Sequence, residues 1–468
     1  MRSLLVSTYE MGRQPFGMAS AAAWLRAAGW EVDCVDVAKE KLARERLMSA
    51  DLVGFHLPMH TATRLAAPIL AAARQANPSA RICAFGLYAP LNGEWLQSLG
   101  ADAVFGGEFE QDLAAFADHV RSTQNPLNTQ KNVISKSSAS SAGSAFDRRD
   151  QRLPKIHFLV PDRTGLPPLS KYATLQLPDG GRRVSGYTEA SRGCRHLCRH
   201  CPIVPIYEGQ FRIVQPEVVL ADLDNQIAAG AGHITFGDPD FFNGPTHAMR
   251  IARALHAKHP QVSYDVTIKV EHLLRHADLV PELAETGCAF VTSAVESVDD
   301  RVLALLDKGH TRAGFIDAVA LCRRAGVTLA PTFVAFHPWL TLASYCDLLD
   351  TIDELDLVDH VAPIQLAIRL LVPEGSRLLT LPEMRTHLGS FDPATLAHSW
   401  THPDPRVDAL QREAIAIVGR RLTSDRRAIF DEVRALAHER AGVSARAVSA
   451  RPARDRATVP YLNEPWYC

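Results

Sequence analysis

The sequence lacks the long apolar runs and the charge excess that would direct a protein to a membrane or a nucleic acid. No stretch of about 18 uninterrupted apolar residues occurs in the chain, and the N-terminal MRSLLVSTYEMG has too short an apolar run for a signal peptide. Fifty Lys and Arg against 52 Asp and Glu give a formal net charge of −2. We therefore expect a cytoplasmic protein with a small-molecule substrate and no nucleic-acid or membrane partner.

Cysteine is also scarce, with nine residues among 468. In a reducing compartment an odd number of cysteines indicates thiols and metal ligands rather than disulfides. The length exceeds what one ordinary core supports, so two or three domains are expected.

Short apolar runs alternate with helical segments over residues 1–118. The runs are SLLVSTY, EVDCVDVA, DLVGFHL, RICAFG and DAVFGGE, and the longest helical segment is TATRLAAPILAAARQA. This alternation predicts a Rossmann-like parallel sheet wrapped by helices. Residues 119–156 are rich in Ser, Asn and Gln and poor in apolar residues, which predicts a flexible linker.

A second and longer β/α series occupies residues 157–400. Its predicted strands are VSGYTEA, HITFGDPDFF, SYDVTIKV, AFVTSAVES, TLAPTFVAF and APIQLAIRLLVP. Six strands, each followed by a helix, predict a partial (β/α)6 barrel of the TIM type, with its chemistry on loops at the strand C-termini. Residues 401–468 predict a helical extension that ends in an irregular tail with Cys468.

Three of the nine cysteines, Cys194, Cys198 and Cys201, lie within eight residues in the order C-x3-C-x2-C. A structural zinc site needs four ligands, and although His196 or His200 offers a fourth, no second C-x-x-C pair exists. A thioredoxin-like redox pair would leave Cys194 without a role. The third interpretation is an iron–sulfur cluster held by three thiolates, with one iron left for a small-molecule ligand.

The motif C-x3-C-x2-C directly after the first strand of a β/α series resembles the signature of the radical SAM superfamily. The resemblance implies that the three cysteines bind a [4Fe-4S] cluster, whose open iron binds S-adenosylmethionine (SAM), and that a flavodoxin- or ferredoxin-type protein supplies the electron. The residue before the third cysteine is usually aromatic in that family and is His200 here. An imidazole can still stack on adenine, so we expect His200 to contact SAM.

Other residues at predicted strand ends are weaker candidates for the same site. The resemblance places Asp238 near an ammonium group, and Glu296 and Ser297 near the ribose and carboxylate of SAM. Asp238 is equally suited to capping a turn, and Glu296 to the N-terminus of a helix. Lys269, Glu271 and Arg369 could hold the SAM carboxylate or a substrate, although each alone is more often part of a structural ion pair.

The N-terminal domain resembles the cobalamin-binding domain that precedes the barrel in one class of these enzymes. The likeness is in fold and order, because the string D-x-H-x-x-G, which supplies an axial histidine in many cobalamin proteins, does not occur. Two alternatives therefore remain: cobalamin bound without a protein ligand, or a domain that is only a scaffold. YEMGRQPFG, residues 9–17, has the composition of a strand-end loop and equally of an ordinary turn.

The tail VPYLNEPWYC, together with AFHPWLTL and IRLLVPEG, resembles a small radical SAM group whose members end in a cysteine- or selenocysteine-bearing tail. That group includes the enzyme of arsinothricin biosynthesis, which transfers the 3-amino-3-carboxypropyl group of SAM to trivalent arsenic. The resemblance gives Cys468 a catalytic role as a soft ligand for arsenite. Our prediction is thus a transferase of this type, with a cobalamin-dependent methyltransferase or a 5′-deoxyadenosyl-radical enzyme as the alternative.

Two further classes of protein stay open from the residues alone. A zinc-stabilised binding protein would be colourless, whereas a cluster gives a brown protein. A cobalamin carrier or sensor would bind the corrinoid even after all three cysteines are changed.

Overall fold

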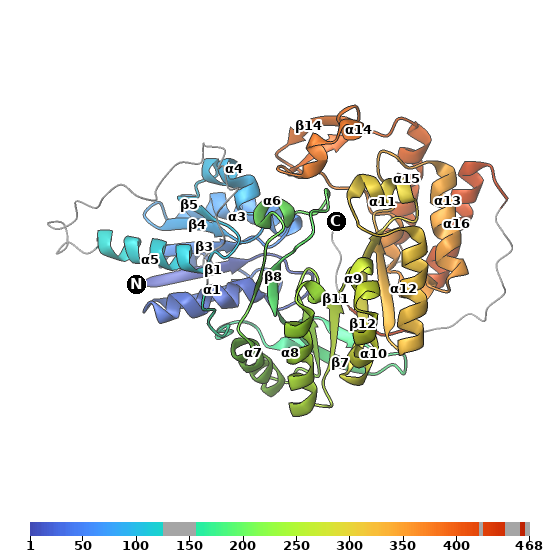
Figure 1. Cartoon of the computed structure of the whole chain (residues 1–468). Helices are drawn as coiled ribbons and strands as arrows, with labels where there is room; N and C mark the ends of the chain where they lie inside the picture. Colours follow the sequence, from blue (N-terminus) through green and yellow to red (C-terminus); the bar gives the residue numbers. More distant parts are fainter. Residues whose placement is uncertain (125–155, 421–424, 445–458, 464–468) are drawn as a thin grey trace. The chain divides into compact units, whose positions relative to one another are not determined.

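The structure is a computed structural model that describes residues 1–124, 156–420, 425–444 and 459–463. Its contacts divide the chain into two compact units (Figure 1). Unit 1 is Met1–Lys171 with Pro393–Leu396, and unit 2 is Tyr172–Asp392 with Ala397–Cys468. No helix in these residues combines the length and the apolar character needed to cross a membrane.

Unit 1 contains a five-stranded parallel sheet in the order β2-β1-β3-β4-β5. Its strands are β1 (Arg2–Ser7), β2 (Glu31–Asp36), β3 (Leu52–His56), β4 (Arg81–Phe85) and β5 (Ala103–Phe105). Its helices are α1 (Phe16–Ala27), α2 (Arg44–Met48), α3 (His60–Ala76), α4 (Gly93–Ser98) and α5 (Glu110–Gln124). The predicted Rossmann-like architecture is confirmed, and the predicted linker falls largely outside the described residues.

Both faces of this sheet are buried, which explains why its strands read as continuous apolar runs. Successive side chains of a strand point to opposite faces. Leu4 therefore packs in one core with Leu70 of α3, whereas Leu5 packs in a second core with Met18 of α1 and Leu113 of α5.

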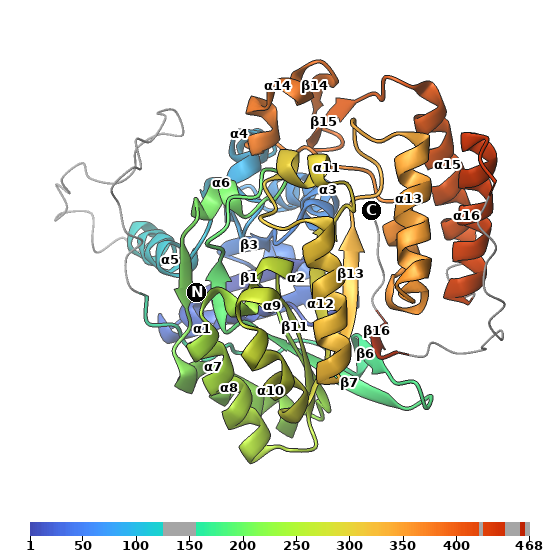
Figure 2. The same ribbon diagram turned by 45° about the vertical axis from the view of Figure 1, so that its right-hand side comes forward.

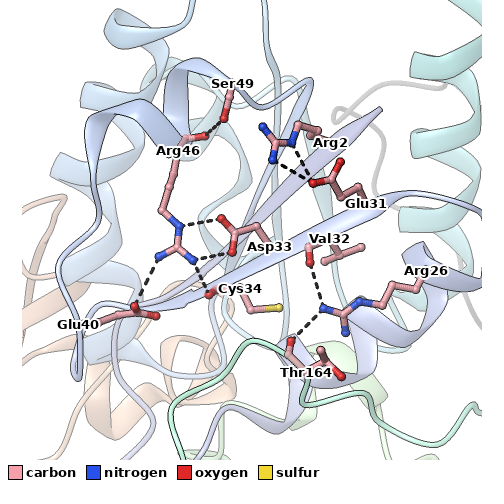
Figure 3. A network of polar contacts seen from close by, with 10 residues as sticks. All are labelled: Arg2, Arg26, Glu31, Val32, Asp33, Cys34, Glu40, Arg46, Ser49 and Thr164. Atoms are coloured by element: carbon pink, nitrogen blue, oxygen red, sulfur yellow. Dashed lines mark hydrogen bonds and ion pairs between the residues drawn. The ribbon is translucent and has the colours of Figure 1, made fainter.

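Arginine side chains cover the outer edge of the sheet at β2 (Figure 3). Arg46 donates to Asp33 through Nε at 2.7 Å and through Nη2 at 2.5 Å, and Nη2 also lies 3.3 Å from the carbonyl oxygen of Cys34. Arg26 donates to the carbonyl oxygen of Val32 at 3.0 Å. The bonds to Cys34 and Val32 occupy carbonyl oxygens that an edge strand would otherwise present to another chain.

Unit 2 is built on a seven-stranded sheet in the order β13-β12-β11-β10-β7-β6-β16. Five strands are parallel: β7 (Arg182–Thr188), β10 (His233–Phe236), β11 (Ser263–Thr267), β12 (Cys288–Glu296) and β13 (Thr328–Phe333). Strands β6 (Thr174–Gln176) and β16 (Tyr461–Leu462) extend it in antiparallel fashion. The connecting helices are α7 (Pro216–Ala228), α8 (Pro245–Lys258), α9 (Val270–Arg275), α10 (Val280–Glu285), α11 (Asp300–Leu306), α12 (Arg312–Ala325) and α13 (Leu342–Glu354), and Figure 2 shows several of them along one face.

The half-barrel is thus confirmed, but its sixth strand differs from the prediction. Residues 363–366 form a 3-10 turn, and the strand position holds one bridge, between Phe336 and Arg369. Pro363 opens the turn and has no N–H to donate to a ladder. The side-chain amide oxygen of Gln365 instead accepts from the backbone of Phe333 at 3.0 Å.

The remaining elements of unit 2 are two small hairpins and a helical C-terminal part. The hairpins pair β8 (Ser191–Gly193) with β9 (Phe211–Ile213) and β14 (Leu388–Asp392) with β15 (Ala397–Trp400). The helices are α6 (Val204–Tyr207), α14 (Pro382–Arg385), α15 (Pro405–Arg420) and α16 (Arg426–Ala441). The predicted helical extension is confirmed, whereas Cys468 lies outside the described residues.

Candidate functional site at the carboxyl edge of the half-barrel

The cysteine loop runs from β8 to α6, after the first parallel strand of unit 2. Cys194 and Cys198 are buried, Cys201 is half-buried, and all three thiols are free. Asn243 holds the start of the loop, because its Oδ1 accepts from the backbone N–H of Arg195 at 3.2 Å. The parallel register places the ends of β7, β10, β11 and β12 at the same edge, so residues that follow these strands gather around the loop.

Lys269 faces the cysteine loop from the N-terminus of α9. Its Nζ lies 3.6 Å from Sγ of Cys198, and the side chain is buried. Lys269 thus places a buried ammonium group within hydrogen-bonding reach of this sulfur atom. Burial raises the pKa of Cys194, and it raises the pKa of Cys201 to about 12, so these two thiols stay protonated until a cation replaces the proton.

Glu296 ends β12 with a left-handed backbone, at φ 69°. Its Oε1 accepts from Nζ of Lys308 at 3.3 Å and lies 3.1 Å from Nε2 of His200. Burial alone would raise the pKa of this carboxyl group, but Lys308 and His200 more than offset burial and lower the pKa to about 2. A strained, buried and ionised carboxylate at a strand end is a typical feature of a functional site.

His200 therefore joins the cysteine loop to the end of β12. Its Nδ1 is buried and has no hydrogen-bond partner among the described residues, so it can still bind a ligand. The expected contact of His200 with SAM stays a prediction.

Both carboxylate oxygens of Asp238 accept hydrogen bonds from the protein, whereas a site for an ammonium group needs an available oxygen. Its two carboxylate oxygens accept from the backbone N–H of Ala190 at 2.9 Å and from Oγ of Ser191 at 2.5 Å. Burial raises its pKa to about 7, and these hydrogen bonds lower it only in part. In this structure Asp238 fixes the segment that leads into the cysteine loop.

The other predicted residues divide between the site and the C-terminal part. Glu271 forms ion pairs with Lys269 at 3.8 Å and with Arg275, next to the loop. Ser297 is buried, and its Oγ accepts from the backbone N–H of Asp299 at 3.1 Å. Arg369 instead donates to Asp408 at 2.6 Å and stacks on the ring of Trp400. Its observed contacts are thus those of a structural residue.

Sequence reasoning missed Lys308 and Asn243. Lys308 comes directly before Gly309, whose φ of 74° marks a tight turn, and a Cβ there would lie 2.4 Å from Oε2 of Glu271. This Lys-Gly pair, after the helix that follows the Glu296 strand, was the available signal. Asn243 offered none, because its role depends on contacts across the fold.

The loop fits an iron–sulfur cluster in the chemistry of its donors. Three free sulfur atoms on one short segment are soft ligands of the kind that bind iron–sulfur clusters, and Lys269 lies beside the sulfur atom of Cys198. Asn243 and Glu296 fix the two sides of that segment.

Residues 188–354 match the family described as the Radical SAM superfamily. Among curated proteins, the chain is 25% identical over 188 residues to a tRNA-2-methylthio-N(6)-dimethylallyladenosine synthase of Moorella thermoacetica. This match covers 36% of the present chain and 40% of the synthase. It is 26% identical over 300 residues to the ribosomal protein uS12 methylthiotransferase RimO of Cereibacter sphaeroides, covering 61% of this chain and 60% of that protein. The chain thus spans less than two thirds of either relative.

Two solved structures extend the likeness of fold to most of the chain. One is the cobalamin-dependent S-adenosylmethionine radical enzyme OxsB with aqua-cobalamin and S-adenosylmethionine bound. It matches with a TM-score of 0.70 at 14% identity, and the match covers 94% of this chain and 72% of the OxsB chain. The other is the radical S-adenosylmethionine methyltransferase TsrM of Kitasatospora setae with tryptophan substrate and a SAM analog bound. It matches with a TM-score of 0.65 at 16% identity, and the match covers 89% of this chain and 88% of the TsrM chain.

Proposed function

We propose, from the match of residues 188–354 to the Radical SAM superfamily, that the chain is a radical SAM enzyme that reductively cleaves SAM in unit 2 and modifies a small molecule, with cobalamin bound by unit 1. The observation that carries the proposal is the position of Cys194, Cys198 and Cys201 at the carboxyl edge of the half-barrel, with Lys269 beside Cys198.

We assign the cluster to the three thiolates and its support to the residues around them. A [4Fe-4S] cluster bound there would supply the electron that breaks a sulfonium S–C bond of SAM. Lys269 offsets negative charge at the sulfur atoms, and Glu296 offers a fixed carboxylate to hydroxyl or ammonium groups of SAM. Lys308 and His200 keep that carboxylate ionised and in place.

Support for cobalamin comes from the fold of unit 1 and from the two solved structures. The histidine at the end of β3, His56, is enclosed, because a Cβ added at Gly17 would lie 2.2 Å from its Nε2 and the ring packs near Phe85 and Phe109. His56 is therefore unsuited to ligate cobalt. We propose that cobalamin binds without an axial histidine, in line with the missing D-x-H-x-x-G string.

The substrate class and the partners follow from general properties. The named substrates of the two curated relatives include a tRNA nucleoside and a ribosomal protein, but a net charge of −2 gives this chain no general attraction for polyanions. We propose a small-molecule substrate, a flavodoxin- or ferredoxin-type electron donor and a cytoplasmic location.

Transfer of the 3-amino-3-carboxypropyl group of SAM to trivalent arsenic is the second candidate. It depends on the resemblance of the tail, and Cys468 lies outside the described residues. The two candidates break different S–C bonds, so their products differ.

One anaerobic experiment tests both. Protein reconstituted with iron, sulfide and cobalamin is incubated with SAM and a chemical reductant, and the SAM fragments are quantified by mass spectrometry, with Cys198→Ala as the matched control. Reduced cobalamin accepts the methyl group when S-adenosylhomocysteine forms. We expect 5′-deoxyadenosine or S-adenosylhomocysteine from wild type and neither from the control. Methylthioadenosine as the sole product would replace the main proposal by the second candidate, and intact SAM in a protein with a full iron complement would refute both.

A further inference from the structure

A second group of metal-ligating side chains lies beside the cysteine loop. It consists of His196 from the loop, Asp240 after β10 and His272 on α9, and one ligand atom from each lies within 4.8 Å of the others. Oδ2 of Asp240 is 3.8 Å from Nε2 of His196 and 2.7 Å from Nδ1 of His272, so Nδ1 is the ligand atom that His272 offers beside Asp240. The other ring nitrogen of His272, Nε2, lies 3.2 Å from Nε2 of His196. Asp240 is fully buried, His272 is 4% exposed, and the side chain of His196 is 16% exposed.

The carboxylate of this group has one oxygen in use and one available. Oδ1 of Asp240 accepts from the backbone N–H of Phe242 at 3.0 Å. Oδ2 lies 2.7 Å from Nδ1 of His272, yet neither atom makes a well-oriented hydrogen bond within the described residues. Two donor atoms that are close but poorly aligned for a hydrogen bond have the arrangement of ligands that share a cation, and a buried carboxylate oxygen is costly to leave without a partner.

The surroundings supply the outer contact that a metal-binding histidine usually has. Oε2 of Glu271 lies 3.6 Å from Nδ1 of His196, on the side of the ring away from the shared Nε2. A carboxylate in this position orients the imidazole and strengthens it as a ligand. The nearby positive charges of Lys269 and Arg275 are themselves paired with Glu271.

We propose that His196, Asp240 and His272 bind one divalent transition-metal ion of the zinc or ferrous type, distinct from the metal at Cys194, Cys198 and Cys201. Two imidazoles and one carboxylate are a ligand set that both ions accept. Three protein ligands leave at least one coordination position, which water or an oxygen or nitrogen atom of a substrate can take. The competing arrangement is a chain of hydrogen bonds from Asp240 through His272 to His196 with no metal.

The test is metal analysis of the full-length, anaerobically purified protein. Zinc and iron are counted separately before and after dialysis against Zn²⁺, in wild type, Asp240→Asn, His272→Gln and the control His276→Gln. His276 is a histidine four residues beyond His272 and outside the group. We expect one zinc per chain in wild type and in the control, and affinity for Zn²⁺ at least about tenfold weaker in the two ligand variants. The cluster absorbance should be the same in all four proteins.

A second variant separates this site from the cysteines. A chain with Cys194, Cys198 and Cys201 all changed to alanine should still bind one Co²⁺, with visible absorption bands that are no longer hidden by the cluster. Zinc or cobalt that disappears with the cysteines would assign the metal to the cysteine loop and overturn the proposal. Wild type that binds neither ion at micromolar concentration would establish the hydrogen-bonded chain instead. Neither result would affect SAM cleavage, so failure here is distinguishable from failure of the proposed function.

Discussion

At the scale of single residues, the site depends on buried opposite charges. The side chains of Glu296 and Lys308 are only 10% and 3% exposed, and they are 3.3 Å apart. Burying each charge alone would cost several kcal/mol, so each depends on its partner. The pair also orients Glu296 toward His200 and hence toward the cysteine loop.

Removing one charge of the Glu296–Lys308 pair should therefore lower the free energy of unfolding more than removing both charges. We expect Lys308→Met to lower the free energy of unfolding by about 3–5 kcal/mol, because it leaves a buried carboxylate without its cation. The double variant Glu296→Gln, Lys308→Met should recover part of that loss. Urea unfolding of the anaerobic apoprotein measures both.

The exposed pair of Lys258 and Asp224 provides the control for this cycle. Lys258→Met should change the free energy of unfolding by less than about 1 kcal/mol. Strictly additive effects of the two site substitutions would show that Glu296 and Lys308 do not depend on each other.

Asp238 gives stability a defined dependence on pH. Its pKa is about 7 in the folded chain, mainly through burial, against 3.8 as the ordinary value. Between these values the folded state binds one more proton than the unfolded state, so the stabilisation is complete below 3.8 and is lost as the pH rises through 7. Relative to Asp238→Asn, the wild-type free energy of unfolding should fall between pH 5 and pH 8. A constant difference over this range would show that Asp238 is ionised throughout.

At the scale of elements, helix α13 begins with a complete capping box. Oγ1 of Thr341 accepts from the backbone N–H of Ser344 at 3.0 Å, and Oγ of Ser344 accepts from the backbone N–H of Thr341 at 2.9 Å. We expect Thr341→Ala to destabilise this helix start by about 1 kcal/mol. Hydrogen exchange followed by mass spectrometry should show faster exchange in the first turn of α13. Ser344→Ala should show a smaller effect, and equal protection in all three proteins would mean that packing alone fixes the helix start.

Elements with a strong local pattern could be predicted from the sequence. The five parallel strands of unit 2 and those of unit 1 were predicted from apolar runs bounded by turn residues. The pattern is clearest in strands such as β3 and β10, in which every residue is buried. The prediction of the sixth strand was wrong because Pro363 begins a 3-10 turn there, in which Leu366 is still buried. Periodicity does not separate these alternatives over so short a run.

The candidate site was predictable where its residues are adjacent in sequence or follow a predicted strand. The spacing of the cysteines predicted the cluster ligands, and the position of Glu296 at a strand end made it a candidate. Asn243 and the partners of Asp238 act across the fold, so no local pattern indicates them, and the only local signal for Lys308 was the glycine that follows it. A charged residue near a strand end need not belong to the site. Arg369 has this position in the sequence, but in the structure it forms an ion pair with Asp408.

At the scale of the whole molecule, each unit carries its own parallel sheet and its own core. The cysteine loop and the residues that contact it belong to unit 2, and the Rossmann-like sheet belongs to unit 1. Ligands of open parallel sheets bind at the carboxyl ends of the strands, so each unit has an edge suited to one cofactor. Loss of one cofactor should then leave binding of the other intact.

Cys198→Ala tests that independence. The substitution removes one of three thiolates in unit 2 and changes no residue of unit 1, so we expect iron content and SAM cleavage to fall while aqua-cobalamin binds with wild-type stoichiometry and affinity. Equilibrium dialysis, iron analysis and SAM-fragment analysis on the same preparation measure all three. Cys346→Ala is the matched control, because Cys346 is a buried cysteine of α13 whose pKa burial raises to about 11, as expected of a thiol that fills space. This control should keep iron, corrinoid and SAM cleavage. Corrinoid lost from Cys198→Ala but kept by Cys346→Ala would show that cobalamin binding requires an intact cysteine loop, and unit 1 could not then be an independent cobalamin domain.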